Sequence, residues 1–162
     1  MTVSDKKTII IGLGNTILSD DGAGIYVVRE IRKRCRTTPY ITVVEASLGG
    51  IGLLDLMAGY QKVVIVDSIK SEHGSPGDIY KIDVDDLGNP TYPTGPHFLD
   101  VRTAVELGSK FGYTMPETID IYAIEIRDNT TFSETLTPGV EKAIPELAHL
   151  IIEYLCPGNG RG

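Results

Sequence analysis

Tryptophan is absent from this chain of 162 residues, and cysteine occurs only twice. Cys35 and Cys156 are too few for a disulfide framework and lack the spacing of a zinc site, so we interpret both as ordinary core or surface thiols. Such thiols fit a reducing, cytoplasmic setting. No segment approaches the roughly 20 apolar residues of a membrane span, and the first residues lack the long apolar run of a secretory signal. We therefore expect no association with a membrane.

Positive charge is scarce, with 15 Lys and Arg against 22 Asp and Glu and a formal net charge of -7. Binding to the phosphates of a nucleic acid needs clustered Lys and Arg, so nucleic acid is not an expected partner. The one basic run, Arg29 to Arg36, is interpreted as a solvated face of a helix. Hydrophobic residues make up 41% of the chain, enough for a single domain over residues 1–162 without a disulfide or structural metal.

Several hydrolase motifs are missing, including H-E-x-x-H, G-x-S-x-G and a basic phosphate loop. Ser47 and Ser68 lie near predicted strand ends, but no adjacent motif supplies a base, which favours loop capping. The glycine-rich segment 12–15 lacks the third glycine of a dinucleotide site. Asp20 and Asp21 before the next helix would also repel a pyrophosphate. A nucleotide-binding α/β enzyme therefore remains an alternative and not the favoured function.

The chain does contain an alternation of strand and helix patterns. Short β-branched runs predict strands at 7–12, 41–45, 62–67 and 118–126, and apolar residues at helical spacing predict helices at 22–36, 50–58, 97–111 and from 137 onward. A further strand at 78–84 alternates polar and apolar residues, as expected of an antiparallel edge. Right-handed crossovers then give an α/β fold, a three-layer αβα sandwich with a mainly parallel, twisted sheet of about five strands and helices on both faces.

The last helix has the most complete sequence pattern. Thr137 is expected as its N-cap and Pro138 as its first helical residue. A buried stripe is expected from Val140, Ile144, Leu147, Ile151 and Leu155.

Three residues with metal-binding chemistry follow strands of the predicted sheet. Asp21 lies in the loop after the first strand, Asp67 ends the third, and the Pro-rich loop 85–96 leads to His97. Ligands of open parallel sheets bind beyond the carboxyl ends of the strands, where the strand order reverses. If the first strand lies between the second and third, the two carboxylates face each other and His97 closes a third side. Two carboxylates and one imidazole form an incomplete coordination set that does not itself name the metal.

Each of these residues also has a structural interpretation. An aspartate before a helix is a common cap, an aspartate that ends a strand often binds loop amides, and a single histidine is usually not a ligand. Asp20 can likewise cap the helix, orient a ligand or act as a base. The predicted convergence of three side chains is what favours a functional site.

The segment IIIGLGNTILSDDGAGIYVVREI, residues 9–31, resembles the N-terminal signature of hydrogenase maturation proteases, in which G-x-G-N is followed by D-D/E-G-x-G. VVIVDSI at 63–69, GPHFLD at 95–100 and TPGVEKAI at 137–144 match the same family in order and spacing. The resemblance covers nearly the whole chain. Where family members commonly have Asp-Gly-Gly or Asp-Gly-Thr after the second strand, this chain has Glu45-Ala46-Ser47, so Glu45 is the candidate acid there.

The resemblance implies an endopeptidase that removes the C-terminal extension of a nickel-loaded hydrogenase large-subunit precursor. It implies that Asp21, Asp67 and His97 form the catalytic and metal-recognising site. The nickel is expected to come with the precursor, and zinc or cadmium to substitute for it in crystals. The expected partner is that precursor, and the expected state is a cytoplasmic monomer. The alternative from another class is a non-enzymatic docking module that senses nickel with the same ligands.

Overall fold

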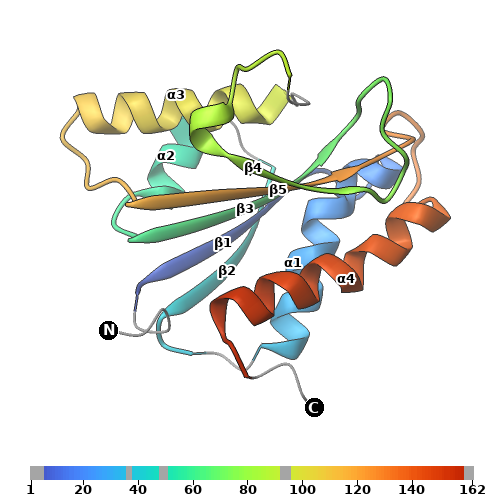
Figure 1. Cartoon of the computed structure of the whole chain (residues 1–162), viewed down its shortest axis with the longest axis horizontal. Coiled ribbons are helices and arrows are strands. Elements are labelled where there is room, and N and C mark those ends of the chain that lie inside the picture. The colour runs from blue at the N-terminus through green and yellow to red at the C-terminus, as the bar shows by residue number, and fades with distance from the viewer. Residues whose placement is uncertain (1–5, 36–37, 48–50, 92–95, 159–162) are drawn as a thin grey trace.

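The computed structural model describes residues 6–35, 38–47, 51–91 and 96–158 (Figure 1). Five strands in these ranges form one sheet in the order β2-β1-β3-β5-β4. The strands are β1 (Thr8–Leu13), β2 (Ile41–Ala46), β3 (Lys62–Ile69), β4 (Ile79–Asp83) and β5 (Thr118–Glu125). β4 is antiparallel to β5, whereas β1, β2, β3 and β5 run parallel. The predicted antiparallel edge and the position of β1 between β2 and β3 are both confirmed.

Helices cover both faces of the sheet (Figure 1). α1 (Ala23–Arg34) and α4 (Pro138–Leu155) lie on one face, and α2 (Ile51–Met57) and α3 (Pro96–Lys110) on the other. This arrangement confirms the predicted αβα sandwich. No helix in the described part of the chain is long and apolar enough to cross a bilayer.

The central strands β1 and β3 are buried along their whole length, because helices cover both of their faces. Successive side chains of a strand point to opposite faces, so the two strands feed two cores. Ile10 and Val64 pack on the side of α1 and α4, whereas Ile9 and Ile65 pack on the side of α2 and α3. The predicted stripe of α4 is buried in the first of these cores, at Val140, Ile144, Leu147, Ile151 and Leu155.

The predicted N-cap position of α4 is confirmed, whereas the aspartate cap expected for α1 is wrong. Thr137 is the N-cap of α4, but its hydroxyl donates to Asp20 Oδ2 at 2.8 Å and makes no capping bond. The buried carboxylate offers this hydroxyl a charged acceptor, which is stronger than a neutral one. The N-cap of α1 is Gly22, and no side chain in the described ranges caps that helix. An unpredicted 3₁₀ helix, Ser19–Gly22, precedes α1 instead.

Two glycines hold the start of α1 against the sheet. A Cβ at Gly24 would overlap the carbonyl oxygens of Val66 and Leu13, and a Cβ at Gly12 would overlap the carbonyl of Gly24. The helix backbone therefore lies directly on the strands, which fixes the 3₁₀ helix above the carboxyl ends of β1 and β3.

The long loop 85–96 is described only in part. It begins within a second short 3₁₀ helix, Val84–Asp86, which the sequence did not predict. Residues 92–95, which include part of the GPHFLD segment, lie outside the described ranges. The helix that follows begins at Pro96, so His97 lies in its first turn.

Candidate functional site

The predicted site residues lie at the carboxyl ends of β1 and β3, where the strand order reverses. Asp67 belongs to β3 and is fully buried. His97 is the second residue of α3, and Asp21 lies in the 3₁₀ helix between β1 and α1, beside β3. Three separate elements thus deliver three potential ligands to one place.

Asp67 and His97 are in direct contact. His97 Nδ1 lies 2.9 Å from Asp67 Oδ2, and the backbone N–H of Ser68 donates to Asp67 Oδ1 at 2.7 Å. Both oxygens of the Asp67 carboxylate are therefore engaged. The His97 side chain is 34% exposed, compared with 1% for Asp67, so the imidazole is the part of this pair that faces solvent. The carboxylate fixes the orientation of the ring, as in the carboxylate–histidine pairs of metal sites.

Burial raises the pKa of Asp67 above its ordinary value, and the hydrogen bond from His97 opposes this shift. The same hydrogen bond raises the pKa of His97, against the effect of its partial burial. The negative charge of Asp21 adds to the increase in both pKa values, so Asp21 lies within electrostatic range of both residues. Together these effects keep a proton within the Asp67–His97 pair to higher pH than either group would keep it alone.

The donor set suits a divalent ion, since imidazole nitrogen and carboxylate oxygen are both common ligands of such ions. In the described ranges, however, no three or more His, Cys, Asp or Glu side chains form a group that could hold a metal ion. The structure brings Asp67 and His97 together and leaves Asp21 near them without a direct contact to either that would complete a coordination shell.

Asp20, the neighbour of Asp21, has a different environment. It is fully buried, and its carboxylate accepts hydrogen bonds from the backbone N–H groups of Arg127, Asp128 and Thr137 and from the Thr137 hydroxyl, at 2.7–3.1 Å. Asp20 thereby ties the loop after β1 to the loop that leads into α4. Its contacts are those of a structural anchor, and neither a helix cap nor an exposed base.

The ion pairs of Glu45 are with residues of α1 and not with the candidate site. Its carboxylate pairs with Arg29 and lies 3.9 Å from Arg32 Nη1. Of the two serines considered as nucleophiles, Ser47 has a loop role, since its hydroxyl donates to the Gly14 carbonyl at 3.2 Å. Ser68 lies within β3 and not in a loop, and its backbone N–H donates to Asp67.

A second buried acid, Glu125, was missed in the sequence. It ends β5 and is 1% exposed, and it accepts hydrogen bonds from the backbone N–H of Ser71 at 2.7 Å and from the Ser71 hydroxyl at 3.0 Å. Glu125 therefore fixes the loop that leaves β3. The signal was present, because an acid that ends an apolar strand is the same pattern that singled out Asp67.

The glycine-rich loop has a structural role as well. Gly14 has φ +147°, and a Cβ there would overlap the carbonyl of Asp21. The 3₁₀ helix Ser19–Gly22 therefore packs directly against this loop, where a nucleotide phosphate would have to bind. This packing argues against the nucleotide-binding alternative.

The family model for hydrogenase maturation proteases matches residues 25–154. The chain belongs to this family. The match includes Asp67 and His97, and Asp21 lies just before it. The protease is 25% identical to the hydrogenase 2 maturation protease of Escherichia coli over 153 residues, which cover 92% of this chain and 90% of the relative.

Solved structures agree with the fold of the protease. The hydrogenase maturating endopeptidase HybD of E. coli superposes with a TM-score of 0.77 at 23% identity, covering 92% of this chain and 91% of that one. The maturation protease HycI of Thermococcus kodakarensis gives a TM-score of 0.71 at 22% identity, with 94% of both chains covered. The protease is thus a peptidase of hydrogenase maturation that acts on the hydrogenase large subunit.

Proposed function

We propose that the protease, acting as one domain over residues 1–162, recognises nickel in the large-subunit precursor through Asp21, Asp67 and His97 and then removes the C-terminal extension. The observation that carries this proposal is the 2.9 Å contact between His97 and the buried Asp67, with Asp21 in electrostatic range of both. The proposal includes a cytoplasmic monomer whose partner is the precursor.

The three residues have separate tasks in this proposal. Asp67 orients the imidazole of His97 and keeps it from rotating. His97, as the exposed member of the pair, meets the nickel, and Asp21 offers a carboxylate oxygen from the other side. A metal ligand must be deprotonated, so His97 would bind the nickel through Nε2 without a proton on that nitrogen, while Nδ1–H stays hydrogen-bonded to Asp67.

The nickel belongs to the substrate, which explains why an incomplete set of ligands on the enzyme is sufficient. A metal bound at this edge of the sheet fixes the position of the precursor relative to the enzyme. It can in addition polarise the scissile carbonyl or activate a water molecule. In either role, cleavage occurs only after nickel insertion.

Purified protease is mixed with nickel-loaded precursor and, separately, with nickel-free precursor, and the precursor mass is followed. We expect a loss of mass corresponding to the extension in the loaded sample alone. Binding of the loaded precursor without any loss of mass would instead identify a nickel-sensing docking module. The site variant Asp21→Asn should abolish this loss of mass. Asp55→Asn removes the same charge from an exposed position on α2, so it is the control for that variant and should leave cleavage unchanged.

A further inference from the structure

α1 and α4 lie side by side on one face of the sheet (Figure 1). Each follows a strand of the parallel set, β1 or β5, so both helices run back from the carboxyl edge of the sheet to its amino edge. Near their N-terminal ends they are joined through Asp20, which accepts hydrogen bonds from the backbone N–H and the hydroxyl of Thr137 at 2.7 and 2.8 Å. Their C-terminal ends lie together at the opposite edge of the sheet.

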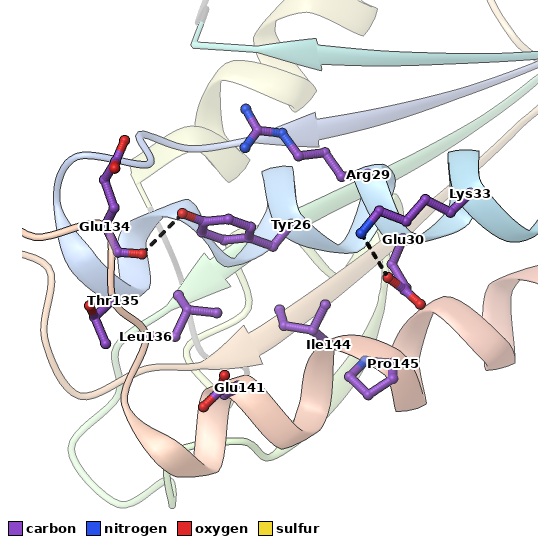
Figure 2. Close-up of a pocket in the computed structure, with 10 residues that line it drawn as sticks. All are labelled: Tyr26, Arg29, Glu30, Lys33, Glu134, Thr135, Leu136, Glu141, Ile144 and Pro145. Carbon is purple, nitrogen blue, oxygen red and sulfur yellow. Dashed lines mark hydrogen bonds and ion pairs between the residues drawn. The ribbon is translucent and has the colours of Figure 1, made fainter.

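The contact between the two helices is interrupted on one side. A groove of about 720 Å³ separates Tyr26 and Glu30 of α1 from Glu141 and Ile144 of α4 (Figure 2). On the side of the sheet, apolar side chains of both helices share one core. Because apolar contacts are not directional, a covalent link at the C-terminal ends would fix the two helices more firmly than the core alone.

The two cysteines of the chain lie at these C-terminal ends. Cys35 is the C-cap of α1 and Cys156 the C-cap of α4, and the backbone N–H of each still donates to the last turn of its own helix. Cys156 is buried in the core between the helices and the sheet, and the half-buried Cys35 packs against the same core. The two side chains are hydrogen-bonded to each other. The fold thus pairs two thiols whose contact the sequence pattern did not predict.

This pairing favours a disulfide. Sulfur atoms in hydrogen-bond contact need to approach by only about 2 Å to reach bonding distance. Both cysteines lie beyond the last helical residue, with ψ angles of 112° for Cys35 and 68° for Cys156. Their backbones can therefore adjust without breaking either helix.

The surroundings of Cys35 indicate a structural bond and not a catalytic dithiol. Burial raises the pKa of the Cys35 thiol, and the neighbouring Cys156 adds to the increase. Reactive cysteines have a lowered pKa instead, because the thiolate is the nucleophile. Oxidation of this pair is therefore expected to be slow and its product to persist.

We propose that Cys35 and Cys156 form a modification site, at which a small disulfide compound such as oxidised glutathione converts the two thiols into one intramolecular disulfide. The thiolate of Cys35, the more exposed of the two, attacks one sulfur of the oxidant, whose S–S bond breaks and releases the first reduced glutathione. The thiolate of Cys156 then attacks Sγ of Cys35 and releases the second. The protease gives up two protons and two electrons, and the oxidant takes them up as two thiols.

The disulfide would join the C-terminal ends of α1 and α4 and enclose residues 35–156, which are most of the chain. A disulfide restricts the unfolded chain, and the stabilisation increases with the length of the enclosed segment. With the bonds between Asp20 and Thr137 near the N-terminal ends, the two helices would be fixed at both ends. The inference is independent of the proposed function.

The test compares protease incubated under native conditions with oxidised glutathione and with dithiothreitol. Intact mass spectrometry should find the oxidised sample lighter by two hydrogen atoms and resistant to alkylation by iodoacetamide, and digestion should yield one cross-linked peptide that contains Cys35 and Cys156. We expect the melting temperature of the oxidised sample to rise by about 5–15 °C, as for a disulfide that encloses a long segment in a domain of this size.

Cys35→Ala is the matched control, because it removes the half-buried thiol and leaves Cys156 in the core. With the oxidant it should gain at most one glutathione, and its melting temperature should not rise. A parent protease that stays reduced, takes up two glutathiones or forms disulfides between two chains overturns the inference. An intramolecular disulfide that leaves the melting temperature unchanged, or lowers it, overturns it as well.

Discussion

Asp20 and Asp21 are adjacent in the chain, but their carboxylates have opposite environments. The Asp21 carboxylate has no anchoring hydrogen bonds among the described residues and lies near Asp67 and His97. Asp21→Asn keeps the shape and removes the charge, so we expect processing of nickel-loaded precursor to fall by about 100-fold or more, with thermal melting unchanged. Cleavage at the parental rate would show that Asp21 does not recognise the metal.

Asp20→Asn should give the reverse result. The Asp20 carboxylate accepts four hydrogen bonds in a fully buried position, and the amide of asparagine offers one acceptor oxygen in place of two. We expect the free energy of unfolding to fall by about 2 kcal/mol or more, measured by urea denaturation. If the variant were as stable as the parent, these bonds would not anchor the two loops.

The variants Asp67→Asn and His97→Gln test whether the Asp67–His97 pair serves processing or only stabilises the fold. The asparagine side chain in the first variant would keep an acceptor for the Ser68 N–H and would remove a buried charge, so stability should be preserved while processing is lost. His97→Gln should also abolish processing, because the glutamine amide is a poor ligand. Circular dichroism and melting serve as controls, and early melting of both variants would mean that the pair is structural.

The pH dependence of His97 follows from its hydrogen bond with Asp67, which raises the pKa of His97 in the folded state. The contribution of this histidine to stability is therefore complete below about pH 6.5 and is lost as the pH rises through the raised pKa. Histidine titration by NMR should place the pKa of His97 above about 6.5 in the parent and lower in Asp67→Asn. Titration of His97 at or below its ordinary pKa in the parent would contradict the pairing.

At the scale of elements, the contact between α1 and the sheet positions the 3₁₀ helix. Gly24→Ala places a methyl group against two backbone carbonyls that cannot turn away, so we expect a loss of about 3 kcal/mol and slower processing, because Asp21 shifts with the helix. Gly108→Ala in α3 is the control. Its methyl group meets only the flexible Met115 side chain, and alanine favours the helix, so stability should change by less than about 1 kcal/mol. Equal losses in both variants would rule out a special role for the Gly24 contact.

At the scale of the whole molecule, two apolar cores on either side of the sheet provide the stability of the protease. We expect treatment with EDTA to leave melting and circular dichroism unchanged, because folding does not depend on a bound metal in such a molecule. Calorimetry before and after chelation checks this. A clear fall in melting temperature would reveal a structural metal.

Most of the architecture could be predicted from the sequence. A strand buried on both faces must lie inside the sheet, as β1 and β3 do, and an alternating strand such as β4 fits its edge. The apolar stripe of α4 must face the sheet. The resulting strand order brings Asp67 and His97 together. The roles of Asp20 and Thr137 could not be predicted, because their bonds join residues more than 100 positions apart. The 3₁₀ helix depends on the same long-range bonds.

The glycines and the acids of the N-terminal signature are required for different reasons. Gly12 and Gly24 are required by the approach of a helix backbone to strand carbonyls, whereas the side chain of Asp21 is free of such constraints. Under the proposed function, a descendant of this chain that kept both glycines and replaced Asp21 would fold and match the same family, but would not respond to nickel. Pseudoenzymes in this lineage are therefore to be sought by the identity of the residue before Gly22, and not by loss of the signature as a whole.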